Sequence, residues 1–98
     1  MPYAFIQDVP ADEAIYRQIR DLLPADAPTG LITHLAVKRE GGLRYVDVWA
    51  SESDWERFRD DHLEPAVGKV LGELGIPHIH DNVAFESIDV IDVWRGER

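Results

Sequence analysis

The chain has 98 residues, of which 45% are hydrophobic, which provides enough apolar side chains for one two-layer core and leaves no room for a second domain. Its formal net charge of -9 disfavours phosphate backbones and anionic membrane surfaces, and no apolar run reaches the roughly 20 residues that span a bilayer. Because cysteine is absent, disulfides and thiolate chemistry are excluded. We expect one domain, residues 1–98, in a cytoplasmic protein with no nucleic-acid or membrane partner.

The N-terminal residues predict a strand followed by a helix. Residues 3–9 have the composition of a strand, and Asp8 is placed to cap a helix over residues 11–23. Apolar side chains recur along these residues at helical spacing, and Pro24 ends the pattern. We therefore expect one face of this helix to be buried.

A β-hairpin is predicted next in the chain. Residues 31–38 have strand character, and the Gly-Gly pair at residues 41–42 supplies the two positive-φ positions of a type I′ turn. A turn centred on these glycines places His34 opposite Trp49, with Asp47 on the diagonal.

The strand after this turn has two alternating sets of side chains. Val46 and Val48 point to one face, while Tyr45, Asp47 and Trp49 point to the other. We predict that the valine face packs on the protomer core, because two helices can cover only one face of the sheet. The second face then borders a cavity that is closed by a second copy of the chain.

A second helix is predicted from a capping box, in which Ser53 accepts a hydrogen bond from the amide of Glu56 and the Glu56 side chain reaches back. Pro65 lacks an amide donor and is expected to break or kink this helix, whose second part ends at Gly75. Residues 83–94 are predicted to form a last extended segment.

The order of these elements is strand, helix, strand, strand, helix, strand. This order is typical of the α+β class, and in particular of the ferredoxin-like split β-α-β fold (βαββαβ) with a four-stranded antiparallel sheet. We expect two such protomers to form a homodimer, packing sheet to sheet into an α+β barrel.

The stretch GLITHLAVKREGGLRYVDVWASESDWERF, residues 30–58, together with DHLEPAV at residues 61–67, resembles the antibiotic biosynthesis monooxygenase-like domains of the dimeric α+β barrel superfamily. The resemblance implies a dimer of ferredoxin-like protomers, with a ligand cavity between each sheet and its helices or within the barrel. Its members range from cofactor-free oxygenases of aromatic polyketides and haem-degrading enzymes to proteins with no known reaction. Trp49 matches the tryptophan that ends the third strand in many members.

Two departures from the family pattern bear on activity. The cofactor-free oxygenases carry an amide four residues before that tryptophan, where this chain has Tyr45. The haem-degrading members use an asparagine on the first strand and a histidine late in the second helix, whereas this chain has Gln7 and the earlier His62. The comparison therefore argues against haem degradation.

His34 and Asp47 are the predicted catalytic pair. A carboxylate can hold one imidazole nitrogen while the other nitrogen acts as a general base toward a ligand. Tyr45 and Trp49 are predicted to bind substrate, as a phenol donor and as an aromatic wall for a flat molecule. The alternatives are a structural pair at the dimer interface, formed by His34 with Asp47 or by Asp47 with Lys38, and a packing role for Tyr45.

The remaining histidines are ambiguous in the sequence. His62 shares a helical stripe with Phe58, so it either reaches the cavity edge as a substrate-binding residue or packs under the sheet. His78 and His80 alternate in an extended stretch and are candidate ligands for zinc or iron, with Asp81 beside them. Two ligands without a positioned third do not make a site, and a polar connector explains the same residues. We therefore predict neither a metal nor a cofactor.

These features favour a small-molecule enzyme, either a cofactor-free monooxygenase or a proton-transfer enzyme, that acts on an aromatic or polyketide-like substrate in the barrel cavity. His34 would be the base, Asp47 its orienting partner, and Tyr45 and Trp49 the binding wall. The alternative is a non-catalytic module of the same fold that binds a hydrophobic ligand or a protein partner.

Overall fold

The computed structural model describes residues 2–76 and 84–94. It contains four strands and three α-helices, with a π-helical segment between the second and third helices. In chain order the elements are β1 (Tyr3–Val9), α1 (Glu13–Leu22), β2 (Leu31–Arg39), β3 (Gly42–Trp49), α2 (Glu52–Phe58), the π-helical segment (Arg59–Leu63), α3 (Glu64–Glu73) and β4 (Ala84–Ile88).

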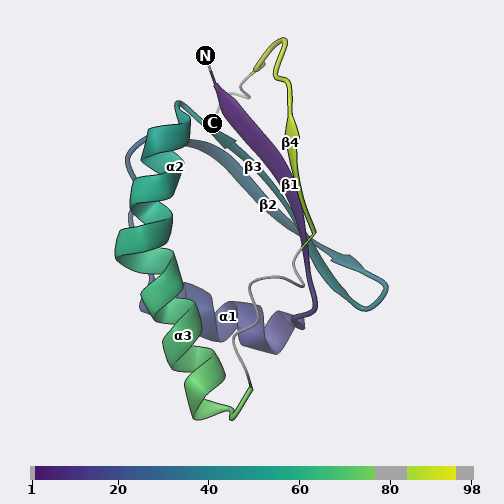
Figure 1. The fold of residues 1–98 in the computed structure, drawn as a ribbon, viewed down its shortest axis with the longest axis vertical. Coiled ribbons are helices and arrows are strands. Elements are labelled where there is room, and N and C mark those ends of the chain that lie inside the picture. The colour runs from purple at the N-terminus through teal and green to yellow at the C-terminus, as the bar shows by residue number, and fades with distance from the viewer. Residues whose placement is uncertain (1, 77–83, 95–98) are drawn as a thin grey trace.

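The four strands form one antiparallel sheet in the order β2-β3-β1-β4. The two halves of the chain thus interleave, with β1 between β3 and β4. Figure 1 shows this sheet on one side of the molecule and all the helices on the other. The predicted ferredoxin-like α+β fold is confirmed.

The helices cover the opposite face of the sheet from the one that the sequence predicted. Phe5 and Trp49 point toward the helices and pack against Trp55 of α2, with 1%, 1% and 6% of their surfaces exposed. A second cluster joins α1 to α3. Large aromatic side chains bury more apolar surface than valines do, and Asp47 tolerates burial on this face because it is hydrogen-bonded there.

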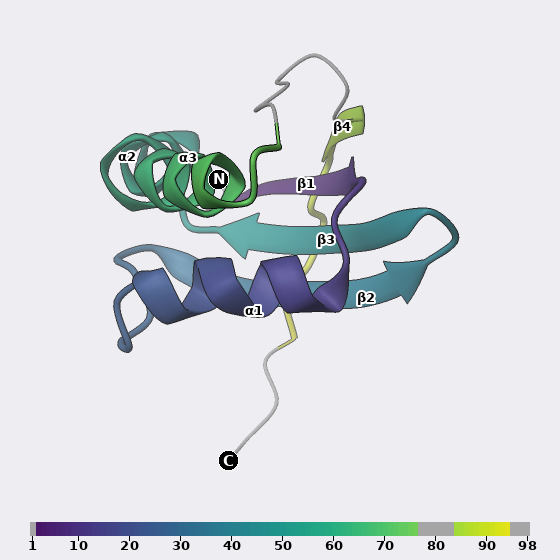
Figure 2. The same cartoon turned by 90° about the horizontal axis from the view of Figure 1, so that it is seen from below.

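Figure 2, turned by 90° from Figure 1, shows α1 crossing the rod formed by α2 and α3 at a steep angle. The second cluster lies where α1 and α3 meet and consists of Ile19, Ala66 and Val70. Leu63 packs against both clusters. The helices therefore converge at one end of the sheet, and the space beneath them is bounded by α1, α3, β1 and β3.

The hairpin between β2 and β3 turns at Glu40 and Gly41, because Arg39 pairs with Gly42. A type I′ turn is excluded, since Gly41 has a φ of 83° but no described residue other than glycine has a positive φ. The predicted turn at residues 41–42 was therefore wrong. Gly42 instead lies in β3, where a Cβ atom would collide with the backbone carbonyl of Val9.

This turn shifts the register of β2 by two residues relative to the prediction. His34 lies directly opposite Asp47, and an irregularity between Leu31 and Thr33 adds one more residue of shift at the start of the strand, so that Leu31 is opposite Trp49. A shift of two residues preserves the face on which each side chain lies. His34 and Asp47 are therefore closer neighbours than the sequence indicated.

The second helical region is one rod with a single wide turn. Ser51, rather than the predicted Ser53, is its N-cap and accepts a hydrogen bond from the Asp54 amide at 3.1 Å. The π-helical segment precedes Pro65, and the Glu64 amide donates to the Arg59 carbonyl across it. The wide turn accommodates the proline, so the rod does not break where the sequence predicted.

The start of α1 and the end of α3 also have recognisable caps. The helix α1 begins after Asp12, whose carboxylate accepts from the Ile15 amide at 2.8 Å, so the predicted Asp8 cap was wrong. The helix α3 ends as predicted at Gly75, which has a φ of 71°. The Ile76 amide donates to the Leu71 carbonyl at 2.8 Å, which completes a Schellman motif.

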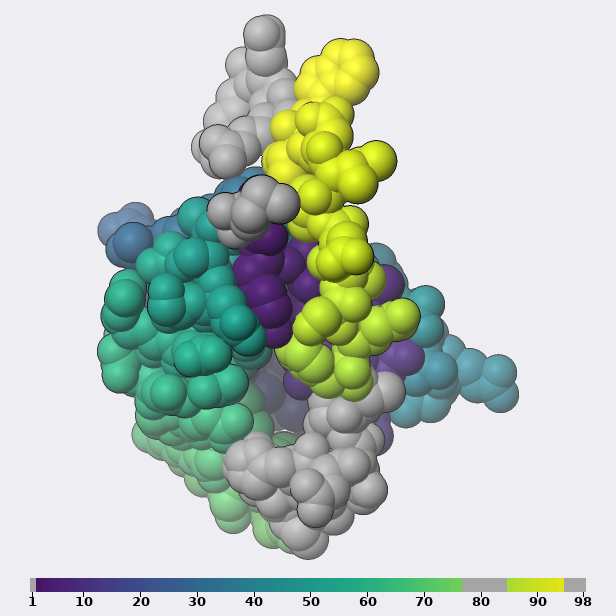
Figure 3. Space-filling model, turned by 45° about the horizontal axis from the view of Figure 1, so that its top comes forward, coloured from purple at the N-terminus to yellow at the C-terminus, as the bar shows by residue number. Residues whose placement is uncertain are grey.

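The C-terminal strand is shorter than predicted, because β4 ends at Ile88. The residues that follow extend away from the body of the molecule, as the yellow end of the chain in Figure 3 shows. Their large apolar side chains Ile91 and Trp94 are 99% and 93% exposed. Within the described residues, no helix is long and apolar enough to cross a membrane.

Candidate functional site

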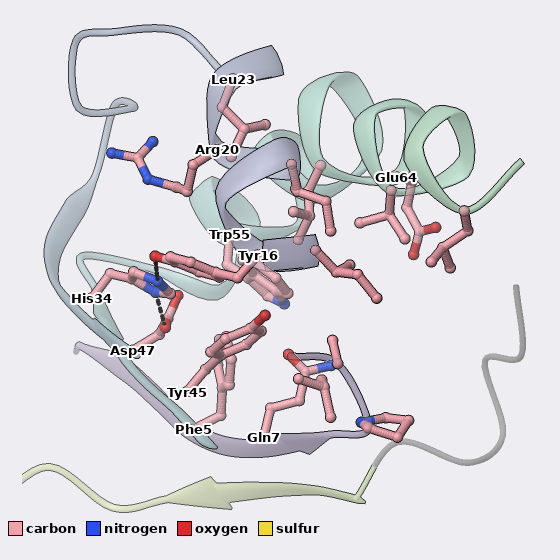
Figure 4. A pocket seen from close by; sticks show the side chains of 18 of the residues that line it. Phe5, Gln7, Tyr16, Arg20, Leu23, His34, Tyr45, Asp47, Trp55 and Glu64 are labelled. Carbon is pink, nitrogen blue, oxygen red and sulfur yellow. Dashed lines mark hydrogen bonds and ion pairs between the residues drawn. The ribbon is translucent and has the colours of Figure 1, made fainter. Parts of the chain in front are cut away.

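A cavity of about 350 Å³ lies between the sheet and the helices. Its size is within the range of small-molecule pockets. Most of its wall is apolar and comes from α1 and the rod of α2 and α3, with Ile15, Ile19, Leu63, Val67 and Leu71 among the lining residues. Aromatic rings and a few polar groups complete it, as Figure 4 shows: Phe5, Tyr16, Tyr45, Trp55, Gln7, Arg20, His34, Asp47 and Glu64.

A chain of three hydrogen bonds runs along one wall of this cavity. The Tyr16 hydroxyl lies 2.9 Å from Nε2 of His34, and Nδ1 of His34 lies 2.6 Å from Oδ1 of Asp47. The indole N–H of Trp49 donates to Oδ2 of the same carboxylate at 3.1 Å. Three separate elements, α1, β2 and β3, thus supply one connected polar network in a largely apolar pocket.

The Asp47 carboxylate determines which atom is the donor in each of these hydrogen bonds. An ionised Asp47 can only accept, so Nδ1 of His34 carries the proton that it donates to Oδ1. In a neutral imidazole Nε2 is then an acceptor, and the Tyr16 hydroxyl donates to it. The network therefore presents a phenol whose proton is already directed at a base.

Pairing across the β2–β3 ladder keeps the network rigid. Asp47 is 5% exposed and is held from both sides, by His34 and by Trp49. The His34 side chain is 28% exposed, so this end of the network is reachable from solvent. A buried carboxylate that orients a partly accessible imidazole is an arrangement that can act as a general base.

Tyr45 adds a second phenol to the same cavity. Its ring centroid lies 5.6 Å from that of Tyr16 and 5.5 Å from that of His34. Burial, together with the nearby charges of Tyr16 and Asp47, raises the pKa of Tyr45 to about 12. The Tyr45 hydroxyl is therefore a stable hydrogen-bond donor at neutral pH.

The structure brings His34, Asp47 and Tyr45 together in the cavity, as the sequence predicted. It places Trp49 differently, because this side chain is 1% exposed and supports Asp47 from below the cavity surface. Trp55, and not Trp49, lines the cavity.

His62 is exposed on the outer side of the helical rod, and its ring lies 5.8 Å from that of Phe58. The helical spacing predicted that it would point inward. The π-helical segment contains one residue more per turn, so Leu63 takes the inward position and lines the cavity. Among the described residues, His62 is not part of the cavity wall.

The predicted metal candidates His78 and His80 lie outside the described residues. In the part of the chain that the structure describes, no three His, Cys, Asp or Glu side chains are grouped closely enough to hold a metal ion.

Two cavity residues of α1, Tyr16 and Arg20, were not predicted from the sequence. Both lie next to the apolar stripe that Ile15 and Ile19 form, so the helix turns these longer side chains toward the sheet edge. The sequence signal that could have identified Tyr16 and Arg20 is their position directly after Ile15 and Ile19 in the helical repeat.

No protein-family model matches this chain, and no curated protein sequence matches it either. Solved structures do resemble it. The Rv0793 protein of Mycobacterium tuberculosis aligns with 95% of this chain and 98% of its own, at 19% identity and a TM-score of 0.57. A protein of unknown function from Nitrosomonas europaea, NE2512, aligns with 99% of this chain and 95% of its own, at 15% identity and a TM-score of 0.61.

A third structure is described as a candidate antibiotic biosynthesis monooxygenase from Bacillus cereus. It aligns with 100% of this chain and 99% of its own, at 14% identity and a TM-score of 0.46, which is too low to support an inference by itself. The first two alignments span nearly the whole of both chains and establish the fold. This chain therefore has the ferredoxin-like α+β protomer fold that its resemblance to the antibiotic biosynthesis monooxygenase-like domains implies.

Proposed function

We propose that this protein is a small-molecule enzyme that moves a proton to or from an aromatic or polyketide-like substrate bound in the cavity. The observation that carries the proposal is the hydrogen-bonded series of Tyr16, His34 and Asp47 at the cavity wall.

The proton follows the direction of these bonds. An acidic proton of the substrate passes to the Tyr16 oxygen while the Tyr16 proton passes to Nε2 of His34. The imidazolium that forms is stabilised by Asp47, and the substrate is left as an anion. The protonated Tyr45 hydroxyl can donate a hydrogen bond to that anion.

The same step is the first requirement of oxygenation without a cofactor. An electron-rich carbanion or enolate can react with molecular oxygen directly, which is the reaction class of the cofactor-free oxygenases that the sequence resembles. We therefore propose proton abstraction as the function of the site, with oxygenation as a further reaction of the anion that it forms.

The test uses 2-tetralone, a bicyclic aromatic ketone with an acidic methylene group. We expect the protein to accelerate exchange of these methylene protons in D₂O, measured by proton NMR. His34→Gln should slow the protein-dependent exchange by roughly 100-fold, since a positioned acid or base contributes at least that much. Lys38→Gln is the matched control, because Lys38 lies on the same strand with a side chain that is 80% exposed. An unchanged rate in His34→Gln would contradict the proposed mechanism.

The alternative function is a non-catalytic module that binds a hydrophobic ligand, which the largely apolar cavity wall favours. The same experiment separates the two functions. Binding of 2-tetralone without any acceleration of exchange would support the binding module over the enzyme.

We also propose that a second copy of the chain covers the helix-free face of the sheet. Leu35 and Val37 are 52% and 43% exposed on this face, beside the partly exposed Val46 and Val48. Adjacent apolar side chains of this size favour association of two sheets. The sequence prediction placed the second copy over the face of Tyr45, Asp47 and Trp49 as the closure of the cavity, but the helices cover that face. The dimer proposed here uses the valine face, on the other side of the sheet from the cavity.

A further inference from the structure

Arg20 differs from the other basic residues that the structure describes. The chain has ten lysines and arginines, and all except Arg95 and Arg98 lie within the described residues. Within that part of the chain Arg20 has no carboxylate partner. The others each form an ion pair with a carboxylate: Arg17, Lys38, Arg39, Arg44, Arg57, Arg59 and Lys69.

Arg20 is also the basic residue that lines the cavity, whereas none of the seven paired residues contributes to its described wall. The chain has 19 acidic residues against ten basic ones, so partners for a surface arginine are plentiful. An unpaired guanidinium at the edge of an apolar pocket is therefore available to a ligand.

Arg20 lies on the same helix as Tyr16, which is part of the hydrogen-bonded series of Tyr16, His34 and Asp47. It follows Tyr16 by four residues on α1, so both side chains project from the same helix face about 6 Å apart along the axis. Figure 4 shows the Arg20 guanidinium at the same end of the pocket as the Tyr16 hydroxyl and His34. Glu64 lies at the other end of the pocket.

We propose that the natural ligand is an acid: an aromatic or polycyclic body that fills the apolar cavity and a carboxylate that Arg20 binds at its mouth. This inference rests on the proposed function and names the substrate class for the same site. The planar guanidinium matches a carboxylate with two parallel hydrogen bonds, and the net charge of -9 disfavours an anion everywhere that lacks such a local cation.

A carboxylate held by Arg20 determines how the ligand enters. Its body points into the cavity, and the groups next to the carboxylate lie beside the Tyr16 hydroxyl. Asp47 does not compete for the guanidinium, because its two oxygens accept from His34 and Trp49.

The test compares two probes that differ in charge and share one ring system: 2-naphthoate and its neutral methyl ester. We expect isothermal titration calorimetry to show that the unmodified protein binds the carboxylate about 10-fold more tightly than the ester. Arg20→Gln should abolish this preference and leave the affinity for the ester unchanged. The preference should also decrease as salt is added, since Arg20 is exposed to solvent.

Arg17→Gln is the matched control. It removes the same charge from the same helix, but Arg17 pairs with Glu13 outside the described cavity wall, so the 10-fold preference should persist. The ester separates ligand binding from the favourable effect of a basic residue in the last turn of α1, because loss of the helix-dipole interaction in Arg20→Gln would weaken the binding of both probes equally.

Three results would overturn the proposal: equal affinity for the two probes in the unmodified protein, loss of the preference in Arg17→Gln as well, or no binding of either probe. Equal affinity combined with slow proton exchange in His34→Gln would reject the acidic ligand alone and leave the proposed proton transfer standing.

Discussion

Tyr45 gives the folded protein a measurable response to alkaline pH. Burial, assisted by the charges of Tyr16 and Asp47, raises the pKa of Tyr45 from 10.0 to about 12. A difference of two pKa units between the folded and unfolded states corresponds to about 2.7 kcal/mol. Because the Tyr45 side chain is only partly buried, solvent screening reduces this contribution, and we expect about 2 kcal/mol.

Stability falls with rising pH because the unfolded chain loses the Tyr45 proton at a lower pH than the folded protein does. The unfolded chain ionises Tyr45 near its ordinary pKa of 10.0, whereas the folded protein keeps the phenol neutral until about pH 12. The stabilisation is therefore complete below about pH 10 and is lost as the pH rises toward 12. Tyr45→Phe removes this dependence, so the free energy of unfolding of the unmodified protein should fall more steeply across this interval, by about 2 kcal/mol.

Two measurements check this response. Urea unfolding at several pH values gives the free energy of unfolding, and the near-ultraviolet absorbance of tyrosinate follows ionisation while circular dichroism reports that the fold is intact. The last tyrosine to ionise should be absent in Tyr45→Phe and present in Tyr3→Phe. The reasoning would be refuted if Tyr45→Phe kept the late ionisation, or if its stability declined with pH as steeply as that of the unmodified protein.

Further substitutions test the hydrogen-bond network, the packing around two glycines and the proposed dimer. Asp47→Asn should lower the free energy of unfolding by about 1–3 kcal/mol, because an amide cannot accept from both the imidazole and the indole; urea unfolding with no loss of stability would contradict the network. Gly42→Ala should destabilise the sheet by about 2 kcal/mol or more, because its Cβ would meet the Val9 carbonyl, whereas Gly68→Ala, with open space around it, should stabilise α3 by up to about 1 kcal/mol. Leu35→Lys should shift the sedimentation of the protein from two copies to one, and an unmodified protein that sediments as a single copy at high micromolar concentration would reject the proposed dimer.

The sequence predicts the order and type of the elements well, because local patterns carry that information. The alternation of residues 3–9 and the apolar spacing on α1 each indicate one element without knowledge of its neighbours. The proximity of His34 and Asp47 was also predictable, since any turn that preserves the alternation puts them on the same face of adjacent strands.

Tertiary contacts account for what the sequence did not predict. The turn moved to Glu40 and Gly41 because Gly42 is needed beside the β1 backbone, which is a contact between strands distant in sequence. The prediction of the face that the helices cover was wrong for a similar reason. Asp47 can be buried on this face only because His34 and Trp49 both donate hydrogen bonds to it. Tyr16 joined the site only because α1 folds back over β2.

The π-helical segment Arg59–Leu63 means that the rod of α2 and α3 stores one surplus residue. Deleting a single amino acid there would let the backbone relax to ordinary α-helical winding while the downstream residues keep their facing, because the wide turn already absorbs the surplus residue. Val67 and Leu71 would therefore stay in the pocket lining. In this fold, the rod can change its length by one residue at this point without reshaping the chamber.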